Sequence, residues 1–196
     1  MMGRTHMLGG LSTLWLLQPI PGALTSDSLL PLCLLATLGA LLPDLDAEVS
    51  LLSSVKIGAI RPLAPISSLL YRQWGHRGPL HSPKLLALIL VPALLIGLAF
   101  GSALFGLALW LGYASHLALD ACTKTGIPKW PRAGRLWLLP PLLRFVTGSE
   151  AEDRLFLVLG CLVIALCLLH LPQSVTPVAP SDSLRVQHNA VASTIS

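Results

Sequence analysis

Five apolar segments, separated by short polar stretches, dominate the pattern of hydrophobic and polar positions. They cover residues 7–24, 28–43, 84–100, 103–121 and 155–171. A helix needs about 20 mainly apolar residues to cross the hydrocarbon core of a bilayer, and several segments reach or approach that length. Prolines interrupt some of them, which is tolerated where a broken helix packs against other helices. The pattern predicts an all-α, polytopic integral membrane protein with about five (four to five) transmembrane or re-entrant helices.

The first apolar segment has an alternative explanation as a cleaved signal peptide whose positively charged n-region contains Arg4. However, the run Gln18-Pro19-Ile20-Pro21 interrupts its apolar core, and no clear small-x-small cleavage site follows. We therefore expect this segment to be retained as a helix.

The composition also differs from that of a soluble domain. Hydrophobic residues make up 54% of the chain and charged residues only 11%, whereas soluble domains contain about 25% charged residues. The four cysteines include no CxxC pair and are expected to be small core residues. We expect residues 1–171 to form a single membrane-embedded domain. The segment 172–196 is rich in Ser, Val, Thr and Pro and is predicted to be a disordered C-terminal tail.

The distribution of Lys and Arg predicts how the chain is oriented in the membrane. With five spans, all but one of the 13 Lys and Arg residues fall on one side, and only Arg185 falls on the other. Because positively charged loops favour the cytoplasmic side, this side is predicted to face the cytoplasm.

A His and an Asp stand four residues apart at the end of the fourth segment, in Gly112-Tyr113-Ala114-Ser115-His116-Leu117-Ala118-Leu119-Asp120. On a helix, residues i and i+4 share one face, with roughly 5–6 Å between their Cβ atoms. This spacing allows both side chains to bind one metal ion, as the paired histidines of HExxH proteins do. An Asp at the end of a membrane helix also needs a partner or a function.

Further His and Asp residues fall at the same predicted membrane face. The predicted metal ligands are His6, Asp44, Asp46, His76, His81, His116 and Asp120. This mixture suits zinc or another divalent ion such as manganese, and the number of ligands allows one or two ions. A two-metal centre would suit hydrolysis of phosphoesters by a metal-activated water.

Individual members of this set also have structural explanations. Asp44 follows Pro43 and could cap a turn, and His76 and His81 could lie in a basic, lipid-facing loop. Arg77, between these histidines, is either a phosphate-binding side chain or a positive charge of a cytoplasmic loop.

Four sequence blocks resemble the YdjM-like family of bacterial inner-membrane proteins, which are described as predicted membrane-bound metal-dependent hydrolases. The blocks are Pro-Asp-Leu-Asp (43–46), His-Arg-Gly-x-x-His-Ser (76–82), Gly-Tyr-x-Ser-His-x-x-x-Asp (112–120) and Thr-Lys-Thr-Gly-Ile-Pro-Lys-Trp-Pro (123–131). Their order is that of the family, and the likeness runs from about His6 to the end of the last apolar segment. The resemblance implies a multi-pass protein of the bacterial inner membrane.

The resemblance also implies a role for Glu152, which matches an acidic position of the family and would be a further ligand or the general base. Glu150 is the nearer alternative, and both could simply be acidic residues at a helix N-terminus. Two positions depart from the family pattern. Ala47 stands where the family often has a His, and Leu80 stands where it often has a Thr.

We therefore expect a membrane-bound metal-dependent hydrolase that acts on a phosphoester or lipid-derived substrate. Arg77 would bind the phosphate, Glu152 would be the base, and membrane lipids would surround the protein. The alternative is a non-catalytic membrane scaffold or a metal-sensing protein whose basic loops bind lipids or a protein partner. A transporter is disfavoured because the polar residues fall at helix ends rather than near the midplane. Direct nucleic-acid binding is not expected because the chain has no helix-turn-helix or zinc-finger pattern.

Overall fold

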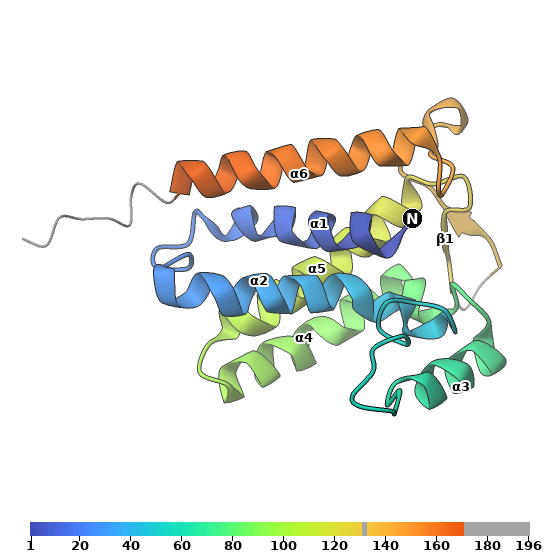
Figure 1. Ribbon diagram of the computed structural model, residues 1–196, viewed down its shortest axis with the longest axis horizontal. Coiled ribbons are helices and arrows are strands. Elements are labelled where there is room, and N and C mark those ends of the chain that lie inside the picture. Colours follow the sequence, from blue (N-terminus) through green and yellow to red (C-terminus); the bar gives the residue numbers. More distant parts are fainter. Residues whose placement is uncertain (131–132, 171–196) are drawn as a thin grey trace, which may run out of the picture.

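A computed structural model describes residues 1–130 and 133–170, which form a bundle of long helices joined by short irregular segments (Figure 1). The predicted disordered tail, residues 172–196, lies outside the described residues. The α-helices are α1 (Gly3–Thr13), α2 (Ser26–Leu41), α3 (Ala64–Trp74), α4 (Pro83–Ala99), α5 (Ala103–Ala121) and α6 (Glu150–His170). The 3₁₀ helices are η1 (Leu14–Leu17), η2 (Leu42–Asp46), η3 (Pro79–His81) and η4 (Pro141–Leu143), and the strands are β1 (Ile127–Pro128) and β2 (Arg135–Leu136).

Each of the five predicted apolar segments forms a helix, although two boundaries differ from the prediction. The first segment is α-helical only to Thr13 and continues as a 3₁₀ turn to Leu17, just before the run that contains two prolines. The last helix begins earlier than the apolar pattern suggests. Its first turn contains Glu150, Glu152 and Asp153, and negative charges at this position stabilise a helix N-terminus.

Helix α3 and the short β1–β2 pair were not predicted from the sequence. Helix α3 has 11 residues, with Pro65 in its first turn, and Gly75 follows its last residue at a φ of 72°. Because α3 is short and mixes polar with apolar side chains, a search for long apolar segments does not find it. Strands β1 and β2 have only two residues each and pair antiparallel.

Two of the described helices are long and apolar enough to cross a membrane by length and composition. They are α2 together with η2 (Ser26–Asp46) and α5 (Ala103–Ala121), and the apolar helix α4 is shorter. The number of spans therefore stays a prediction, whereas the predominantly helical character of the chain is confirmed.

Helix α5 occupies the centre of the bundle and contacts α1, α2 and α4, while α6 packs on α1. Helices α1 and α2, α1 and α5, and α4 and α5 pack antiparallel, whereas α2 and α5 run in the same direction, as do α1 and α6 (Figure 1). Glycines allow their backbones to approach closely. A Cβ atom at Gly112 would collide with the carbonyl oxygen of Ala36 in α2, and one at Gly106 would collide with that of Ala93 in α4. Small residues at such crossings are typical of helix packing in membranes.

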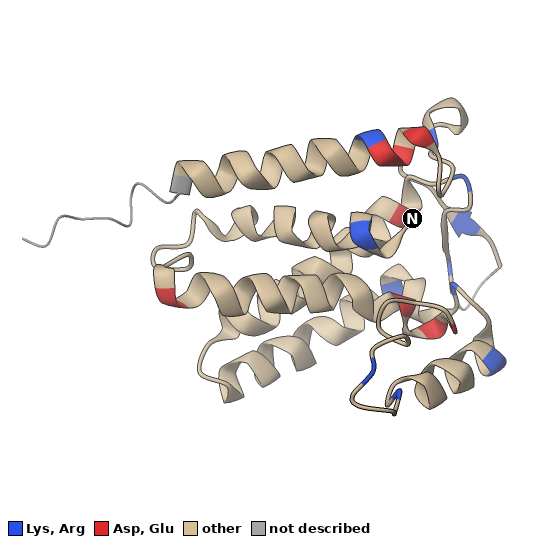
Figure 2. Cartoon of the chain, in the orientation of Figure 1, with Lys and Arg blue, Asp and Glu red and all other residues tan. Residues whose placement is uncertain are grey.

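The same end of the bundle contains the start of α1, the end of α2, the end of α5 and the start of α6. Figure 2 shows the Lys, Arg, Asp and Glu residues gathered at this end, with long uncharged stretches of helix beside it. The first turn of α2, at the opposite end, contains Asp27. The packing of α5 therefore brings segments that are distant in sequence to one polar site.

Candidate metal centre

The centre of the polar site is a pair of buried histidines, His81 from η3 and His116 from α5. Their Nε2 atoms lie 3.2 Å apart. The Nδ1 of His116 lies 2.7 Å from the carbonyl oxygen of Ala40, and the Nδ1 of His81 lies 3.1 Å from Oδ2 of Asp46. Because both of these partners are acceptors, each Nδ1 carries the hydrogen. Each Nε2 of a neutral ring then presents a lone pair to the other, an arrangement that favours a cation beside them.

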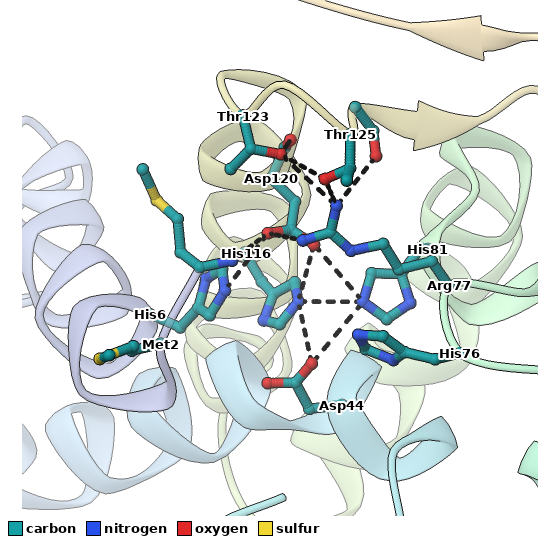
Figure 3. Close-up of polar contacts among 12 residues, drawn as sticks. Met2, His6, Asp44, His76, Arg77, His81, His116, Asp120, Thr123 and Thr125 are labelled. Atoms are coloured by element: carbon teal, nitrogen blue, oxygen red, sulfur yellow. Dashed lines mark hydrogen bonds and ion pairs between the residues drawn. The ribbon is translucent and has the colours of Figure 1, made fainter. Parts of the chain in front are cut away.

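Two carboxylates complete a four-atom set around this pair (Figure 3). Oδ1 of Asp44 lies 3.8 Å from His81 Nε2 and 3.7 Å from His116 Nε2. Oδ2 of Asp120 lies 3.7 and 3.8 Å from the same two atoms. In a tetrahedral zinc site with bonds of about 2.1 Å, ligand atoms lie about 3.4 Å apart. The two nitrogens and either one of the two oxygens therefore lie at separations that suit ligands of one divalent ion.

His6 lies against this set from α1. Its ring stacks on the ring of His116, with the centroids 3.6 Å apart and the planes inclined by 14°. Its Nε2 lies 3.5 Å from Oδ1 of Asp120. Both ring nitrogens are buried and have no hydrogen-bond partner in the described part of the chain. Because a buried polar atom without a partner is costly, His6 also fits a site that contains a cation.

Asp46 and His76 lie outside the four-atom set. The Asp46 carboxylate accepts hydrogen bonds from Nδ1 of His76 at 2.9 Å, Nδ1 of His81 at 3.1 Å and the backbone N–H of Gly78 at 3.1 Å. A carboxylate bound to the far nitrogen of a ligand histidine sets its tautomer and its orientation. The structure therefore gives Asp46 the contacts of a positioning residue, and His76, whose side chain is 44% exposed, lies at the rim.

Arg77 binds the carboxylate oxygen of Asp120 that does not face His81 and His116. Its Nη2 donates to Oδ1 of Asp120 at 3.0 Å, and its Nη1 donates to the hydroxyls of Thr123, at 3.4 Å, and Thr125. The α-amino group of Met1 also contacts Oδ1 of Asp120, at 2.7 Å. The backbone of Arg77 has a φ of 62°, which is uncommon for a residue other than glycine. Such a conformation persists where the surrounding contacts require it, and it is frequent at functional sites.

Glu152 has a different set of partners. Its buried carboxylate accepts hydrogen bonds from the backbone N–H groups of Met2 and Gly148 and from the hydroxyl of Thr5 at 3.0 Å. In the described chain, its hydrogen bonds join α6 to the start of α1 rather than reaching the histidines. Glu150, the alternative acidic residue, is exposed and lies 3.8 Å from Arg154.

A cavity of about 460 Å³ with a mixed polar and apolar lining reaches one side of the four-atom set. Its lining includes Asp44, His76, Ala47 and Thr147. Ala47, which stands where the family often has a His, therefore faces this cavity beside Asp44. The cavity allows a water molecule or a polar substrate to approach Asp44.

The protonation of His81 depends on its surroundings. Burial disfavours the charged imidazolium, but Asp44 beside Nε2 and Asp46 beside Nδ1 outweigh it and raise the pKa of His81 to about 8. A cation at Nε2 would therefore compete with a proton.

Several contributing residues were not singled out from the sequence. Thr123 and Thr125 bind Arg77, and Tyr113 donates its hydroxyl hydrogen to the carbonyl oxygen of Leu80, next to His81. These three residues lie within the sequence blocks that resemble the family, so membership of those blocks could have identified them from the sequence. Thr5, which binds Glu152, had no such signal.

Comparison with protein families gives a match to the YdjM inner membrane protein over residues 1–175 of the 196. No curated protein and no solved structure matches the chain. The matched range contains every residue of the polar site and agrees with the resemblance carried by the four sequence blocks. The chain belongs to the YdjM inner membrane protein family.

Proposed function

We propose that this protein is a membrane-bound, metal-dependent hydrolase of phosphoesters. The observation that carries the proposal is the approach of His81 and His116 through their Nε2 atoms, 3.2 Å apart, with Asp44 and Asp120 beside them. Two imidazoles and two carboxylates form a donor set that suits zinc and, among other first-row ions, manganese.

The geometry favours a centre with one ion. Among the residues that the structure describes, two groups could bind a metal. They are His6, His116 and Asp120, and Asp44, His81 and His116. His116 belongs to both groups, and its Nδ1 already donates to Ala40. Because the remaining lone pair on Nε2 can bind only one ion, we propose His81, His116, Asp44 and Asp120 as the ligands. His6 would be an additional ligand or would support Asp120.

The other residues would position these ligands and the substrate. A divalent ion in this position would supply Lewis acidity, which lowers the pKa of a bound water and polarises a phosphoryl oxygen. Asp46 holds the ring of His81 so that its Nε2 faces the centre. Arg77 holds Asp120, and its guanidinium places a positive charge beside the centre that can bind a phosphate group.

We propose a structural role for Glu152. Its carboxylate joins Met2 and Thr5 of the N-terminal segment to Gly148, which precedes α6. This link holds α1, which carries His6, against the end of the bundle. A role as the general base would require Glu152 to release these donors.

We also propose that the bundle crosses the inner membrane with the metal centre at the cytoplasmic face. The apolar helices α1, α2, α4, α5 and α6 would supply the five spans. The gathering of Lys and Arg at the end that contains the metal centre supports this orientation (Figure 2).

Hydrolysis of model phosphoesters by the metal-loaded protein tests the proposed function. Detergent-purified protein would be reconstituted with zinc or manganese and assayed with p-nitrophenyl phosphate and bis-p-nitrophenyl phosphate. We expect metal-dependent release of nitrophenol that is lost in the variant His116→Ala. Ser115→Ala is the matched control, because Ser115 is the buried neighbour of His116 and its hydroxyl donates within α5, to the carbonyl oxygen of Gly112.

Metal-loaded protein that hydrolyses neither compound would contradict the proposed hydrolysis of phosphoesters. A metal-sensing protein or a membrane scaffold would then explain the centre better. For the scaffold, His116→Ala should retain partner binding, whereas removal of Lys and Arg side chains from the basic loops should reduce it.

A further inference from the structure

A second cavity, of about 340 Å³, forms an apolar groove beside the metal centre. Leu109, Trp110 and Tyr113 of α5 form its floor. Leu42 and Leu45 of η2 form one wall, and the other wall is α4. The groove exists because α2 and α4 both pack on α5, which leaves a space between them.

The wall formed by α4 extends the groove away from the polar end of the bundle. The lining residues of this helix run from Leu85 through Ile89 and Ala93 to Ile96. At 1.5 Å per residue, this stretch is about 16 Å long. Pro92 and Ile96 are exposed at the surface of the bundle, so the groove opens on the flank of an apolar helix. In a protein of an inner-membrane family, such a flank faces hydrocarbon chains.

The other end of the groove lies next to the metal centre. Leu45 of η2 immediately follows Asp44, and Leu80 of η3 immediately precedes His81. On α5, Tyr113 of the groove lies three residues before His116, which is about one helical turn. Three separate elements therefore each carry a groove residue within three positions of a residue of the metal centre.

We propose that this groove binds the hydrocarbon chain of an amphiphilic phosphoester, a lipid-type molecule whose phosphate lies at the metal centre. The inference rests on the proposed function and narrows its substrate class. An apolar channel that ends at a site with a metal-binding set and Arg77 matches a molecule with one anionic end and one long apolar end. A small, water-soluble phosphoester would leave the groove without an occupant.

Photolabelling with alkyl phosphates tests the groove without requiring turnover. Metal-loaded protein would be labelled with dodecyl phosphate that carries a diazirine at the far end of its chain, and the adducts would be located by mass spectrometry. We expect adducts close to Pro92 and Ile96. Unlabelled dodecyl phosphate should compete much better than hexyl phosphate, because each buried methylene strengthens binding about fourfold.

Two neighbouring variants provide a matched comparison. Ile96→Trp fills the far end of the groove, whereas Leu95→Trp adds the same side chain at a similarly exposed residue outside it (57% and 60% exposed). Ile96→Trp should weaken competition by dodecyl phosphate by at least about tenfold, since two or more methylenes lose their contacts. It should leave competition by hexyl phosphate unchanged. Leu95→Trp should not change competition by either alkyl phosphate.

Equal effects of the two variants, or adducts spread evenly over lipid-facing side chains such as Leu95, would overturn the inference. Labelling of the groove in a protein without phosphoesterase activity would support the groove and contradict the proposed function. Hydrolysis of p-nitrophenyl phosphate without labelling of the groove would support the proposed function and contradict the groove as a binding site for the hydrocarbon chain.

Discussion

His81 and His116 face each other through Nε2 atoms that lie 3.2 Å apart, while the Nδ1 of each ring is held by an oxygen acceptor. Two neutral rings in this arrangement repel each other through their lone pairs. A proton on His81 or a metal cation removes the repulsion, and the nearby carboxylates, Asp44 among them, stabilise either one. The proposed metal ion would therefore bind both rings after displacing the proton from His81.

Asp46→Asn tests whether Asp46 positions His81. The amide retains the size of the side chain but loses the charge that accepts hydrogen bonds from His76, His81 and Gly78. We expect metal affinity to fall by about 10- to 100-fold, as is typical for the loss of such a partner. A competitive titration against a fluorescent zinc chelator measures this effect. Glu48→Gln, an exposed neighbour, is the control, and equal affinities of the two variants would contradict the positioning role.

Metal affinity should depend on pH through His81, whose pKa is raised to about 8 by Asp44 and Asp46 against the effect of burial. Below pH 8 a metal ion must displace the proton from His81, so the apparent affinity should fall about tenfold per pH unit. Above pH 8 His81 carries no proton to displace, so the apparent metal affinity should no longer change with pH through this residue. Affinities that stay constant between pH 6 and pH 8 would contradict His81 as a ligand.

The metal-free protein should show the opposite dependence. Because folding raises the pKa of His81 from 6.5 to about 8, the charged ring stabilises the metal-free fold fully below pH 6.5. That contribution is lost as the pH rises through 8. Thermal unfolding of metal-free protein at several pH values measures it. In His81→Gln this part of the pH dependence should disappear, and an unchanged profile would assign it to another group.

Glu152→Gln distinguishes a structural role from a catalytic one. The amide cannot replace the charged acceptor for Met2, Thr5 and Gly148. We expect the variant to be about 1–3 kcal/mol less stable, with its metal content retained. Thermal unfolding in detergent measures the loss, and the exposed Glu150→Gln should be close to neutral. Unchanged stability together with a 10²- to 10⁴-fold lower kcat would instead identify Glu152 as the general base.

Arg77→Lys tests phosphate binding at the centre. Lysine retains the positive charge but cannot make the two-pronged contact of a guanidinium. We expect the KM for phosphoesters to rise about tenfold, or about 1.4 kcal/mol, the size of one lost charge-assisted hydrogen bond. Arg72→Lys, at an exposed residue of α3, should have normal kinetics. An unchanged KM in Arg77→Lys would contradict phosphate binding by Arg77 and leave it only the role of holding Asp120.

The sequence could predict those parts of the site that depend on local geometry. His116 and Asp120 share a face of α5 because of their i, i+4 spacing, and the apolar pattern located the helix that carries them. The order of the five apolar segments also predicted that Asp44, at the end of the second, and His81, before the third, lie at the same end of the bundle.

The division of roles within the site could not be predicted in this way. Asp44 and Asp46 are two residues apart, and only the 3₁₀ turn of η2 directs one carboxylate to the histidine Nε2 atoms and the other to Nδ1 of His81. The partners of Glu152 depend on how α6 packs against α1. Helix α3 was missed because its apolar residues are too few to form a membrane-length segment.

Metal content tests the central claim most directly. Inductively coupled plasma mass spectrometry would be applied to detergent-purified protein, to the double variant His116→Ala/Asp120→Ala and to Ser115→Ala. We predict about one equivalent of zinc or manganese in the parent protein and in Ser115→Ala, and none in the double variant. A parent protein that binds no metal even after reconstitution, with a double variant that is equally stable, would contradict the metal centre.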